Sequence, residues 1–417
     1  MGLIHALPFI AMLLGIALLP LLVPHLWEHP AGPIALVVAC SLPAVLDAAA
    51  TGQLHATAEA LGEYIAFIAL IATLFVIAGG IHISGNPQAK PSVNAAILGI
   101  GAVLASFVGT TGASMLLIRP LLETNRERRF KKHIVVFFIL LVSNVGGLLT
   151  PLGDPPLYLG YLNGVPFTFT FGLWPAWVIA VALLLGFFLV WDQRQYAREP
   201  LAALKLDVAR ETKLAIAGQG NILIALAIVL TSASGVGHPW REILFAVYVA
   251  LSIAITPKGL REANSFTYGP IKEVAILFFG IFVTMVPAIE ALKEIAPSLP
   301  VNTAAGLFFM SGALSSVLDN APTYLIFATL ASERAGFGAH LGELAAHAPH
   351  LLAAISIGSV FMGANTYIGN GPNLLVKAVA ESAGDARVEM PNFLAYAAIA
   401  TATLTPVYIA VVWLVLG

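Results

Sequence analysis

The sequence has little charge and almost no cysteine. Lys, Arg, Asp and Glu make up 10% of its 417 residues, whereas 59% are hydrophobic. A soluble protein carries about 25% charged residues, so this composition indicates a membrane protein with several spans. Cys40 is the only cysteine, which excludes a disulfide within the chain. The net charge of −2 gives no sign of a nucleic-acid partner, and we expect none.

The apolar runs predict an all-α polytopic membrane protein. The first 24 residues lack the basic start and cleavage site of a signal peptide, so we expect a first transmembrane helix there. Each further run is near or above the length of about 20 residues that crosses a bilayer. The predicted spans lie near 7–24, 33–47, 61–82, 134–163 (broken), 172–191, 215–233, 240–256, 272–292, 350–382 (broken) and 391–416.

Two of these spans contain helix-breaking residues next to polar side chains. Residues 143–156 read Ser-Asn-Val-Gly-Gly-Leu-Leu-Thr-Pro-Leu-Gly-Asp-Pro-Pro, and each proline removes a backbone donor from a helix. A second copy at 363–373 superposes on part of the first without a gap. Irregular backbone at membrane depth persists only where protein or water satisfies it, so both stretches predict broken helices that line a transport site.

Two other apolar segments, 93–123 and 302–332, are interrupted in the middle. The first break is Gly-Thr-Thr-Gly at 109–112, and the second is Leu-Asp-Asn-Ala-Pro at 318–322. Such an interruption is typical of a helical hairpin that enters and leaves the membrane on one side. We therefore expect two re-entrant hairpins beside the two broken helices.

The basic residues predict the orientation. Three clusters of Lys and Arg fall on one side of the predicted spans, and the positive-inside rule makes that side cytoplasmic. The span at 61–82 then runs inward and its counterpart at 272–292 outward, the two hairpins enter from opposite sides, and both chain ends come out external. The clusters are Arg126, Arg128, Arg129, Lys131 and Lys132; Arg194, Arg198, Lys205, Arg210 and Lys213; and Lys258, Arg261 and Lys272.

The two halves also match in sequence. Residues 63–77 align with 272–286, and 108–115 with 317–324, at one constant offset. Matching segments in opposite orientations form an inverted-topology repeat, which is typical of secondary transporters. The polar stretch 192–213 links the halves, and we expect a surface amphipathic helix there. The predicted organisation is N-terminal scaffold helices at 1–59, repeat 1 at 60–165, a linker and scaffold helices at 166–269, repeat 2 at 270–385, and a C-terminal transmembrane helix at 386–417.

The motifs in these repeats resemble the ion transporter superfamily, which includes citrate and dicarboxylate transporters and NhaD-type sodium/proton antiporters. Residues 146–156 resemble the broken-helix signature of that family, and their Asp-Pro-Pro form is similar to the NhaD type. Asp-Asn-Ala-Pro-Thr at 319–323 resembles the second hairpin tip of the antiporters. The first tip differs, because 110–112 read Thr-Thr-Gly where antiporters carry Asp-Asn, and it is nearer the neutral tips of carboxylate carriers.

This resemblance implies a homodimer with a scaffold domain and an elevator-like transport domain, which holds the two hairpins and the two broken helices. We expect the lipid bilayer, a small inorganic cation and protons as partners. No cofactor is expected, and Na⁺ would be the transported or coupling ion. The expected location is the inner (plasma) membrane of a prokaryote.

Asp319 and Asp154 are the leading candidates for binding a cation or a proton. An acid near the bilayer centre is costly unless it binds a cation, forms a pair or takes up a proton. A structural alternative exists, because Asp319 precedes a half-helix starting at Asn320 and is suited to cap it. Both interpretations also apply to Asp154, and we favour a functional role for both acids.

Neutral side chains near these acids offer oxygen ligands suited to Na⁺. An interhelical hydrogen bond is the more common role for any single one of them. The matching of Thr150 with Thr366 and of Asp154 with Asn370 between the two copies favours a shared site. The predicted proton and cation site comprises Asp154, Asp319, Asn320, Thr150, Asn370 and Thr366; further candidates for a substrate site are Thr110, Thr111, Ser114, Asn144, Thr323, Asn365 and Asn373.

Two isolated cations, Arg119 and Lys377, lie inside apolar segments. They either balance the acids, attract an anionic substrate or extend to the membrane interface. For a lone histidine at a helix end, His82, we expect a structural role. Three histidines beside Glu343 fit a solvated external loop better than a metal site: His340, His347 and His350.

The leading hypothesis is a secondary transporter that exchanges Na⁺ for protons by an elevator-like movement, because each repeat carries one intramembrane acid. The alternative is a Na⁺-coupled transporter of citrate or a related carboxylate, which the neutral first hairpin supports and the two acids oppose. An intramembrane protease is disfavoured, because 151–154 lack the first glycine of a Gly-x-Gly-Asp motif. A passive channel is also disfavoured, because it would give the inverted repeat no function. We therefore expect no enzymatic activity.

Overall fold

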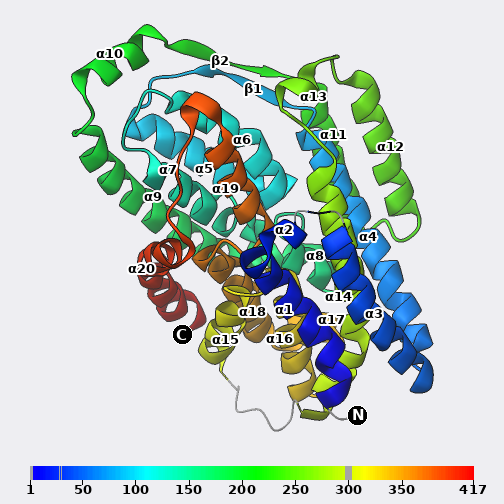
Figure 1. The fold of residues 1–417 in the computed structure, drawn as a ribbon. Helices are drawn as coiled ribbons and strands as arrows, with labels where there is room; N and C mark the ends of the chain where they lie inside the picture. Colours follow the sequence, from blue (N-terminus) through cyan, green and yellow to red (C-terminus); the bar gives the residue numbers. More distant parts are fainter. Residues whose placement is uncertain (1–2, 28, 30, 296–302) are drawn as a thin grey trace.

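The structure, a computed structural model, describes residues 3–27, 29, 31–295 and 303–417. Its regular structure is almost entirely helical (Figure 1). Within the described residues, seven helices are long and apolar enough to cross a bilayer, which confirms an integral, polytopic membrane protein. They span Ala31–Ala50, Leu54–Ala78, Pro91–Val108, Lys132–Leu149, Phe167–Tyr196, Gly269–Ala291 and Phe393–Leu416. A bent pair, Leu341–His347 with Pro349–Asn365 at 115°, adds an eighth if it counts as one span.

A layer of long helices forms one side of the molecule (Figure 1). It contains α1 (Leu7–Leu22), α3 (Ala31–Ala50), α4 (Leu54–Ala78) and α14 (Gly269–Ile295), and α14 packs against the other three. Aromatic contacts fix α4 on α14, since the ring of Tyr64 meets those of Phe279 and Phe282 edge-on at 5.7 and 5.8 Å.

The first predicted hairpin and broken helix are interrupted where the sequence indicates. Helices α5 (Pro91–Val108) and α6 (Thr110–Thr124) pack together and meet at Gly109, whose φ of +81° favours glycine. The broken helix consists of α7 (Lys132–Leu141), a 3-10 turn η2 (Val145–Leu149) and α8 (Pro155–Leu162). Pro155 and Pro156 open α8, at positions where a missing N–H costs nothing.

The second hairpin and broken helix follow the same plan. They consist of α15 (Ala304–Ser315) and α16 (Asn320–Arg334), then α17 (Leu341–His347), α18 (Pro349–Met362), η5 (Gly363–Asn365) and α19 (Gly371–Ser382). The predicted start of this hairpin at residue 302 lies outside the described residues. In both halves, one hairpin lies beside the break of its own broken helix, since α5 contacts η2, and Ser316 at the end of α15 bonds to residues 362 and 365.

The remaining helices surround this central part. They are η1 (Leu3–Ala6), α2 (Pro24–Trp27), η3 (Phe167–Leu173), α9 (Trp174–Tyr196), α10 (Leu201–Ala209), α11 (Gly220–Ala233), α12 (Trp240–Ile255), α13 (Leu260–Ala263), η6 (Gly384–Ala386), α20 (Phe393–Val411) and a final π-helical turn η7 (Val412–Leu416).

A small sheet departs from the all-α prediction. β1 (His82–Asn86) pairs antiparallel with β2 (Thr212–Ala217), with a bulge between Ser84 and Asn86. The span predicted at 61–82 therefore ends at Ala78, and the one predicted at 215–233 begins at Gly220. The stretch 192–213, predicted to hold a surface helix, is shared by the end of α9, the mostly exposed helix α10 and the start of β2. Each strand is too short to show a period, and its partner lies more than a hundred residues away.

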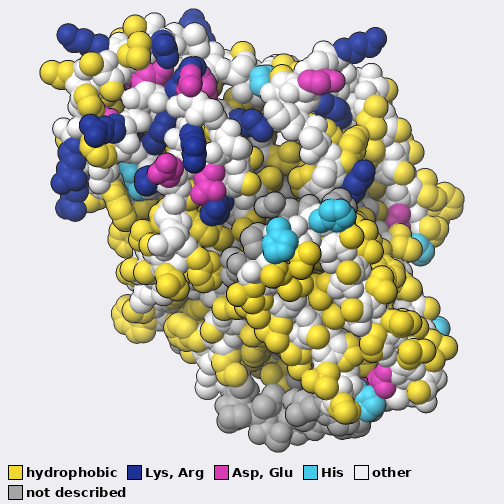
Figure 2. All heavy atoms as spheres, in the orientation of Figure 1, with side chains coloured by type: hydrophobic (Ala, Val, Ile, Leu, Met, Phe, Trp, Pro, Cys, Tyr) yellow, Lys and Arg dark blue, Asp and Glu magenta, His cyan; other side chains and the backbone are white. Residues whose placement is uncertain are grey.

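The basic residues gather at one end of the molecule. Figure 2 shows Lys and Arg over the end that carries α10 and the two strands, whereas the visible surface below is mostly hydrophobic. The start of α1 and the turn η7 lie toward the opposite end (Figure 1). We call the first end the basic face.

Candidate functional site

Asp154 is buried at the point where the first broken helix resumes as α8. It occupies the N-cap position in extended conformation and is 2% exposed. Its side chain makes no capping bond to the helix it precedes. The carboxylate instead accepts hydrogen bonds from elsewhere in the chain, so its placement is not explained by helix capping.

Three side chains from three other helix starts donate to this carboxylate. Thr110 Oγ1 donates to Oδ1 over 2.8 Å, and Asn370 Nδ2 donates to the same oxygen over 3.3 Å. Asn320 Nδ2 donates to Oδ2. Thr110 begins α6, Asn320 begins α16, and Asn370 precedes α19. We call Asp154 and these three donors the central cluster.

Two further asparagines, Asn144 and Asn373, form a hydrogen-bonded layer next to the central cluster. The amide of Asn370 also donates to Asn144 Oδ1 over 3.2 Å and to the carbonyl of Ser143 over 3.1 Å. Asn144 in turn donates to Asn373 Oδ1 over 2.8 Å. Because Ser143 and Asn144 lie in the first broken helix and Asn370 and Asn373 in the second, this layer ties the two together. Asn373 also donates to the carbonyls of residues 363 and 366 in its own broken helix, over 2.9 Å each.

The two matched threonines, Thr150 and Thr366, form equivalent bonds outside the central cluster. Thr150 Oγ1 donates to the carbonyl of Ser106 near the end of α5, and Thr366 Oγ1 donates to the carbonyl of Ser316 at the end of α15. The two serines match as well, since Ser106 donates to the carbonyl of Gly146 and Ser316 to that of residue 362. Both threonines therefore fix a hairpin to its broken helix, and neither contacts Asp154.

Asp319 lies next to the central cluster in the chain but has a different role in the structure. Its side chain is partly buried and accepts the backbone N–H of Ala321 over 3.0 Å, which caps α16. Thr323 Oγ1 donates to the carbonyl of Asp319 over 3.0 Å, within the same helix turn. Among the described residues, the contacts of Asp319 are therefore those of a helix cap. The carboxylate of Asp154 is instead held by polar side chains.

The remaining candidates lie around the two hairpins. Ser114 Oγ and Ser143 Oγ are 2.9 Å apart, behind the start of α6. Asn365 donates to Ser316 Oγ over 2.9 Å and accepts from Tyr408 over 2.9 Å. Thr111 lines a small cavity beside Asp154.

That cavity provides room at the carboxylate. It has a volume of about 40 Å³ and lies between α4 and the tips of the first hairpin and broken helix, lined among others by Leu74, Thr110, Thr111, Asp154 and Tyr158. A water molecule occupies about 30 Å³ of the liquid, so the space suits one small ion or water. The Oδ1 oxygen of Asn320 and the hydroxyl of Tyr158 are buried, and neither has a hydrogen-bond partner among the described residues.

The other predicted charges lie apart from the central cluster. Lys377 Nζ pairs with Glu381 at 2.6 Å within α19. His347 and Glu343 lie 3.3 Å apart in α17, which is a short helix where a loop was predicted. Among the described residues, no group of three or more His, Cys, Asp or Glu side chains is arranged to hold a metal ion.

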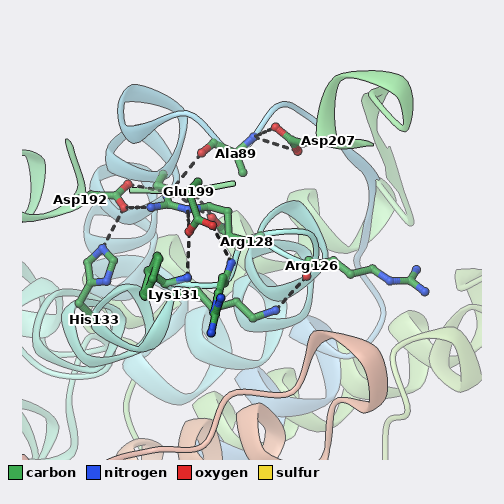
Figure 3. Close-up of polar contacts among 12 residues, drawn as sticks. Ala89, Arg126, Arg128, Lys131, His133, Asp192, Glu199 and Asp207 are labelled. Atoms are coloured by element: carbon green, nitrogen blue, oxygen red, sulfur yellow. Dashed lines mark hydrogen bonds and ion pairs between the residues drawn. The ribbon is translucent and has the colours of Figure 1, made fainter. Parts of the chain in front are cut away.

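A second buried network lies at the basic face (Figure 3), and sequence reasoning missed it. Arg128, with its side chain 1% exposed, pairs with Asp192 at 2.6 Å and with Glu199 at 3.5 Å. His133 Nε2 donates to the same Asp192 oxygen over 2.8 Å, and Asn94 donates to the other over 3.2 Å. The network therefore fixes the loop between α6 and α7 to the end of α9. In the sequence, Arg128 belongs to a cluster of basic residues expected at the surface, so nothing in the sequence indicated its burial.

Further polar contacts lie in this loop and beside it. Glu199 accepts the backbone N–H groups of Arg129 and Phe130, over 2.9 and 2.8 Å. Lys131 Nζ donates to a backbone carbonyl over 3.1 Å, and burial lowers the pKa of this lysine. Asp207 accepts the N–H of Ala89 over 3.0 Å, and burial raises the pKa of its carboxyl.

A polytopic helical protein with a polar centre built from two broken helices has the architecture of a membrane transporter. The chain belongs to the family whose model is described as "Putative citrate transport", and that model matches residues 1–416. No curated protein matches the sequence. The family supports the likeness to citrate and dicarboxylate transporters, and it does not single out the NhaD-type antiporters.

Proposed function

We propose that the protein is a Na⁺-coupled transporter of citrate or a related carboxylate. The observation that carries this proposal is the convergence of four helix starts at the central cluster: α6 at Thr110, α8 at Pro155, α16 at Asn320 and α19 at Gly371. The start of a helix carries a partial positive charge and unpaired N–H groups, which favour a bound anion. Family membership supports citrate as the class of substrate.

Asp154 explains why such an anion site needs a cation. When ionised, its carboxylate repels a carboxylate substrate, which was the argument against this function. A Na⁺ ion bound at Asp154 removes that repulsion and leaves the four helix starts free to attract the substrate. Asp154 thus couples the binding of the cation to the binding of the anion.

The surroundings of Asp154 support a site for a small cation. The adjoining cavity of about 40 Å³ is large enough for one ion. Asn320 Oδ1 is buried without a partner among the described residues, and its oxygen is a suitable neutral ligand beside the carboxylate. Thr110 Oγ1, at 2.8 Å from the carboxylate, offers a third oxygen.

The wider architecture belongs to the same proposal. Matched hydrogen bonds from Thr150 and Thr366 to the ends of α5 and α15 support an inverted-topology repeat with two re-entrant hairpins. The basic face supports a cytoplasmic orientation of that end. We further propose an elevator-like movement of hairpins and broken helices, a homodimer, and a location in the inner (plasma) membrane of a prokaryote.

Exchange of Na⁺ for protons is the second candidate. It is favoured by the two acids, Asp154 in the central cluster and Asp319 at the neighbouring helix cap. In that mechanism the carboxylate of Asp154 takes up a proton when the cation leaves, and no organic anion is required.

Uptake by proteoliposomes separates the two candidates. The proposal predicts uptake of labelled citrate that requires an inward Na⁺ gradient and falls to background in Asp154→Asn. Wild-type protein that takes up no citrate, but dequenches a trapped pH dye when Na⁺ or Li⁺ alone is added, would establish the exchange mechanism instead. An exposed acid, Asp385, whose side chain is 81% exposed, provides the matched control Asp385→Asn, which should retain uptake.

A further inference from the structure

A cavity at the basic face has no role in the function described above. Its volume is about 310 Å³, and it lies between β1, the second half of α6, and α13. Its polar lining includes His82, Ser84, Arg119, Glu123 and Asn264. It lies at the small end of the size range of ligand pockets, about 300–1,000 Å³, which suits a small organic ligand.

Arg119 gives this cavity an available positive charge. Within the described residues, its guanidinium has no ion pair or hydrogen bond, in contrast to Arg126 and Arg128 nearby in sequence. Among the described residues of the lining, Glu123 is the only acid, and Arg126 engages it, with Nη1 and Oε1 3.2 Å apart. A guanidinium presents five N–H donors in a planar fork that matches a carboxylate.

His82 adds a second nitrogen to the same cavity. Asn264 donates its amide to the carbonyls of residues 79 and 81, over 2.9 and 2.7 Å, so its Oδ1 is an acceptor. His82 Nδ1, 2.7 Å from that oxygen, must therefore carry a proton, and Nε2 of the neutral ring remains as an acceptor, suited to the hydroxyl group of a citrate-like ligand. This arrangement depends on β1, whose bulge requires Gly85 at φ +119°.

Helix α6 connects this cavity to the central cluster. Its first residue, Thr110, bonds to Asp154, and its residues Met115, Leu116 and Arg119 line the cavity. Arg119 lies nine positions after Thr110, which corresponds to about 13 Å along a helix. One helix thus presents an ion site at its start and a cationic cavity further along, toward the basic face.

We propose that this cavity binds the carboxylate substrate at the basic face, with Arg119 as its main anchor and His82 as a second contact. This inference rests on the proposed function, since it takes its ligand to be the citrate-like anion that the protein carries. The two sites have separate tasks: Asp154 couples transport to the cation, whereas Arg119 collects the anion before it reaches the central cluster.

The test measures the half-saturating citrate concentration separately from each face of the membrane, in right-side-out and inside-out vesicles. Arg119→Gln should raise this concentration about tenfold or more from the basic face and leave the opposite face unchanged. Arg119→Lys, which keeps the charge but loses the fork, should give an intermediate value. A general folding defect would change both faces together, so the sidedness is specific to the proposal.

The control is Arg198→Gln, which removes an exposed arginine that lies outside the cavity lining on the same face. It should leave both half-saturating concentrations unchanged. Equal values for wild type and Arg119→Gln at the basic face would overturn the inference while the transport function stands. Wild-type vesicles that take up no citrate would instead overturn the proposed function and, with it, this assignment. A cavity that binds inorganic phosphate but not citrate, in a wild type that transports citrate, would also overturn it.

Discussion

Asp154 and Asp319 look equivalent in sequence, yet their side chains have different partners. Asp154 accepts bonds from three side chains on three other elements, and Asp319 accepts a backbone N–H of its own helix. An acid that only caps a helix can be replaced by asparagine, which is as good an N-cap. An acid that binds the coupling cation cannot be replaced in this way, since the amide has no charge.

This difference leads to a comparison of two matched substitutions. Asp319→Asn should retain Na⁺-dependent citrate uptake within about twofold, because the cap persists. Asp154→Asn should lose uptake to background, while the purified protein elutes in size-exclusion chromatography like the wild type. If Asp319→Asn abolishes uptake and Asp154→Asn does not, the coupling role belongs to Asp319 and the central cluster is structural.

Asp207 yields a prediction about pH at the basic face. Burial raises the pKa of its carboxyl above the ordinary value of 3.8, so the folded state holds the proton more tightly than the unfolded state. Asp207 therefore contributes most to the free energy of unfolding when the pH is below that ordinary pKa. This contribution is lost as the pH rises through the raised pKa of the folded state.

Asp207→Asn should reveal this loss. The amide oxygen can still accept the N–H of Ala89 but never becomes charged. Thermal unfolding in detergent should show similar melting temperatures for variant and wild type near about pH 4, with the variant higher at about pH 7. A difference in melting temperature that is constant across this pH range would mean that the charge of Asp207 does not destabilise the folded state.

At the scale of elements, the breaks depend on close contacts between backbone segments. A Cβ added at Gly153 would lie 2.7 Å from the carbonyl carbon of Gly147, and one at Gly369 would lie 2.7 Å from the carbonyl oxygen of Ser315. Real Cβ atoms essentially never approach so closely, so both broken helices require glycine at this point.

Gly153→Ala should therefore destabilise the first broken helix by about 1–3 kcal/mol through overpacking. We expect a lower melting temperature and weaker uptake than in the wild type. The matched control is Gly172→Ala, because a Cβ there meets no atom of the described residues within 4 Å. Equal melting temperatures for both variants would show that the backbone at the break relaxes without cost.

The ion network at the basic face holds a loop rather than a transport site. Arg128→Gln leaves Asp192 and Glu199 buried with their main cationic partner removed, which typically costs about 3–5 kcal/mol. The exposed Arg198→Gln should cost much less. Melting temperatures of the two purified variants check this, and a small effect for Arg128→Gln would mean that His133 and Asn94 alone keep Asp192 paired.

For the molecule as a whole, sequence patterns predicted most of the long apolar helices and their interruptions, because these depend on local composition. The breaks at 109 and 151–156 follow from glycine and proline, and the structure has helix ends at both. The sheet formed by β1 and β2 was missed, because its pairing joins residues such as His82 and Ala217 across distant parts of the chain.

The site was predicted only in part, for the same reason. Polar residues inside apolar sequence identified Asp154, Asn320 and Asn370, but nothing local shows which of them meet. The structure brings these three together with Thr110, and gives Thr150 and Thr366 backbone partners instead. Long-range contacts also hid the burial of Arg128 and the cavity at Arg119.

The central claim is that a cation at Asp154 enables binding of a carboxylate at the converging helix starts. The most direct test is the affinity of purified protein for citrate, measured by calorimetry in Na⁺ and in an equal concentration of choline. Coupling predicts that Na⁺ tightens citrate binding by about 5- to 150-fold, and that citrate tightens Na⁺ binding by the same factor. In Asp154→Asn this dependence should vanish. Citrate affinities that are equal in Na⁺ and in choline, for folded wild-type protein, would contradict the account.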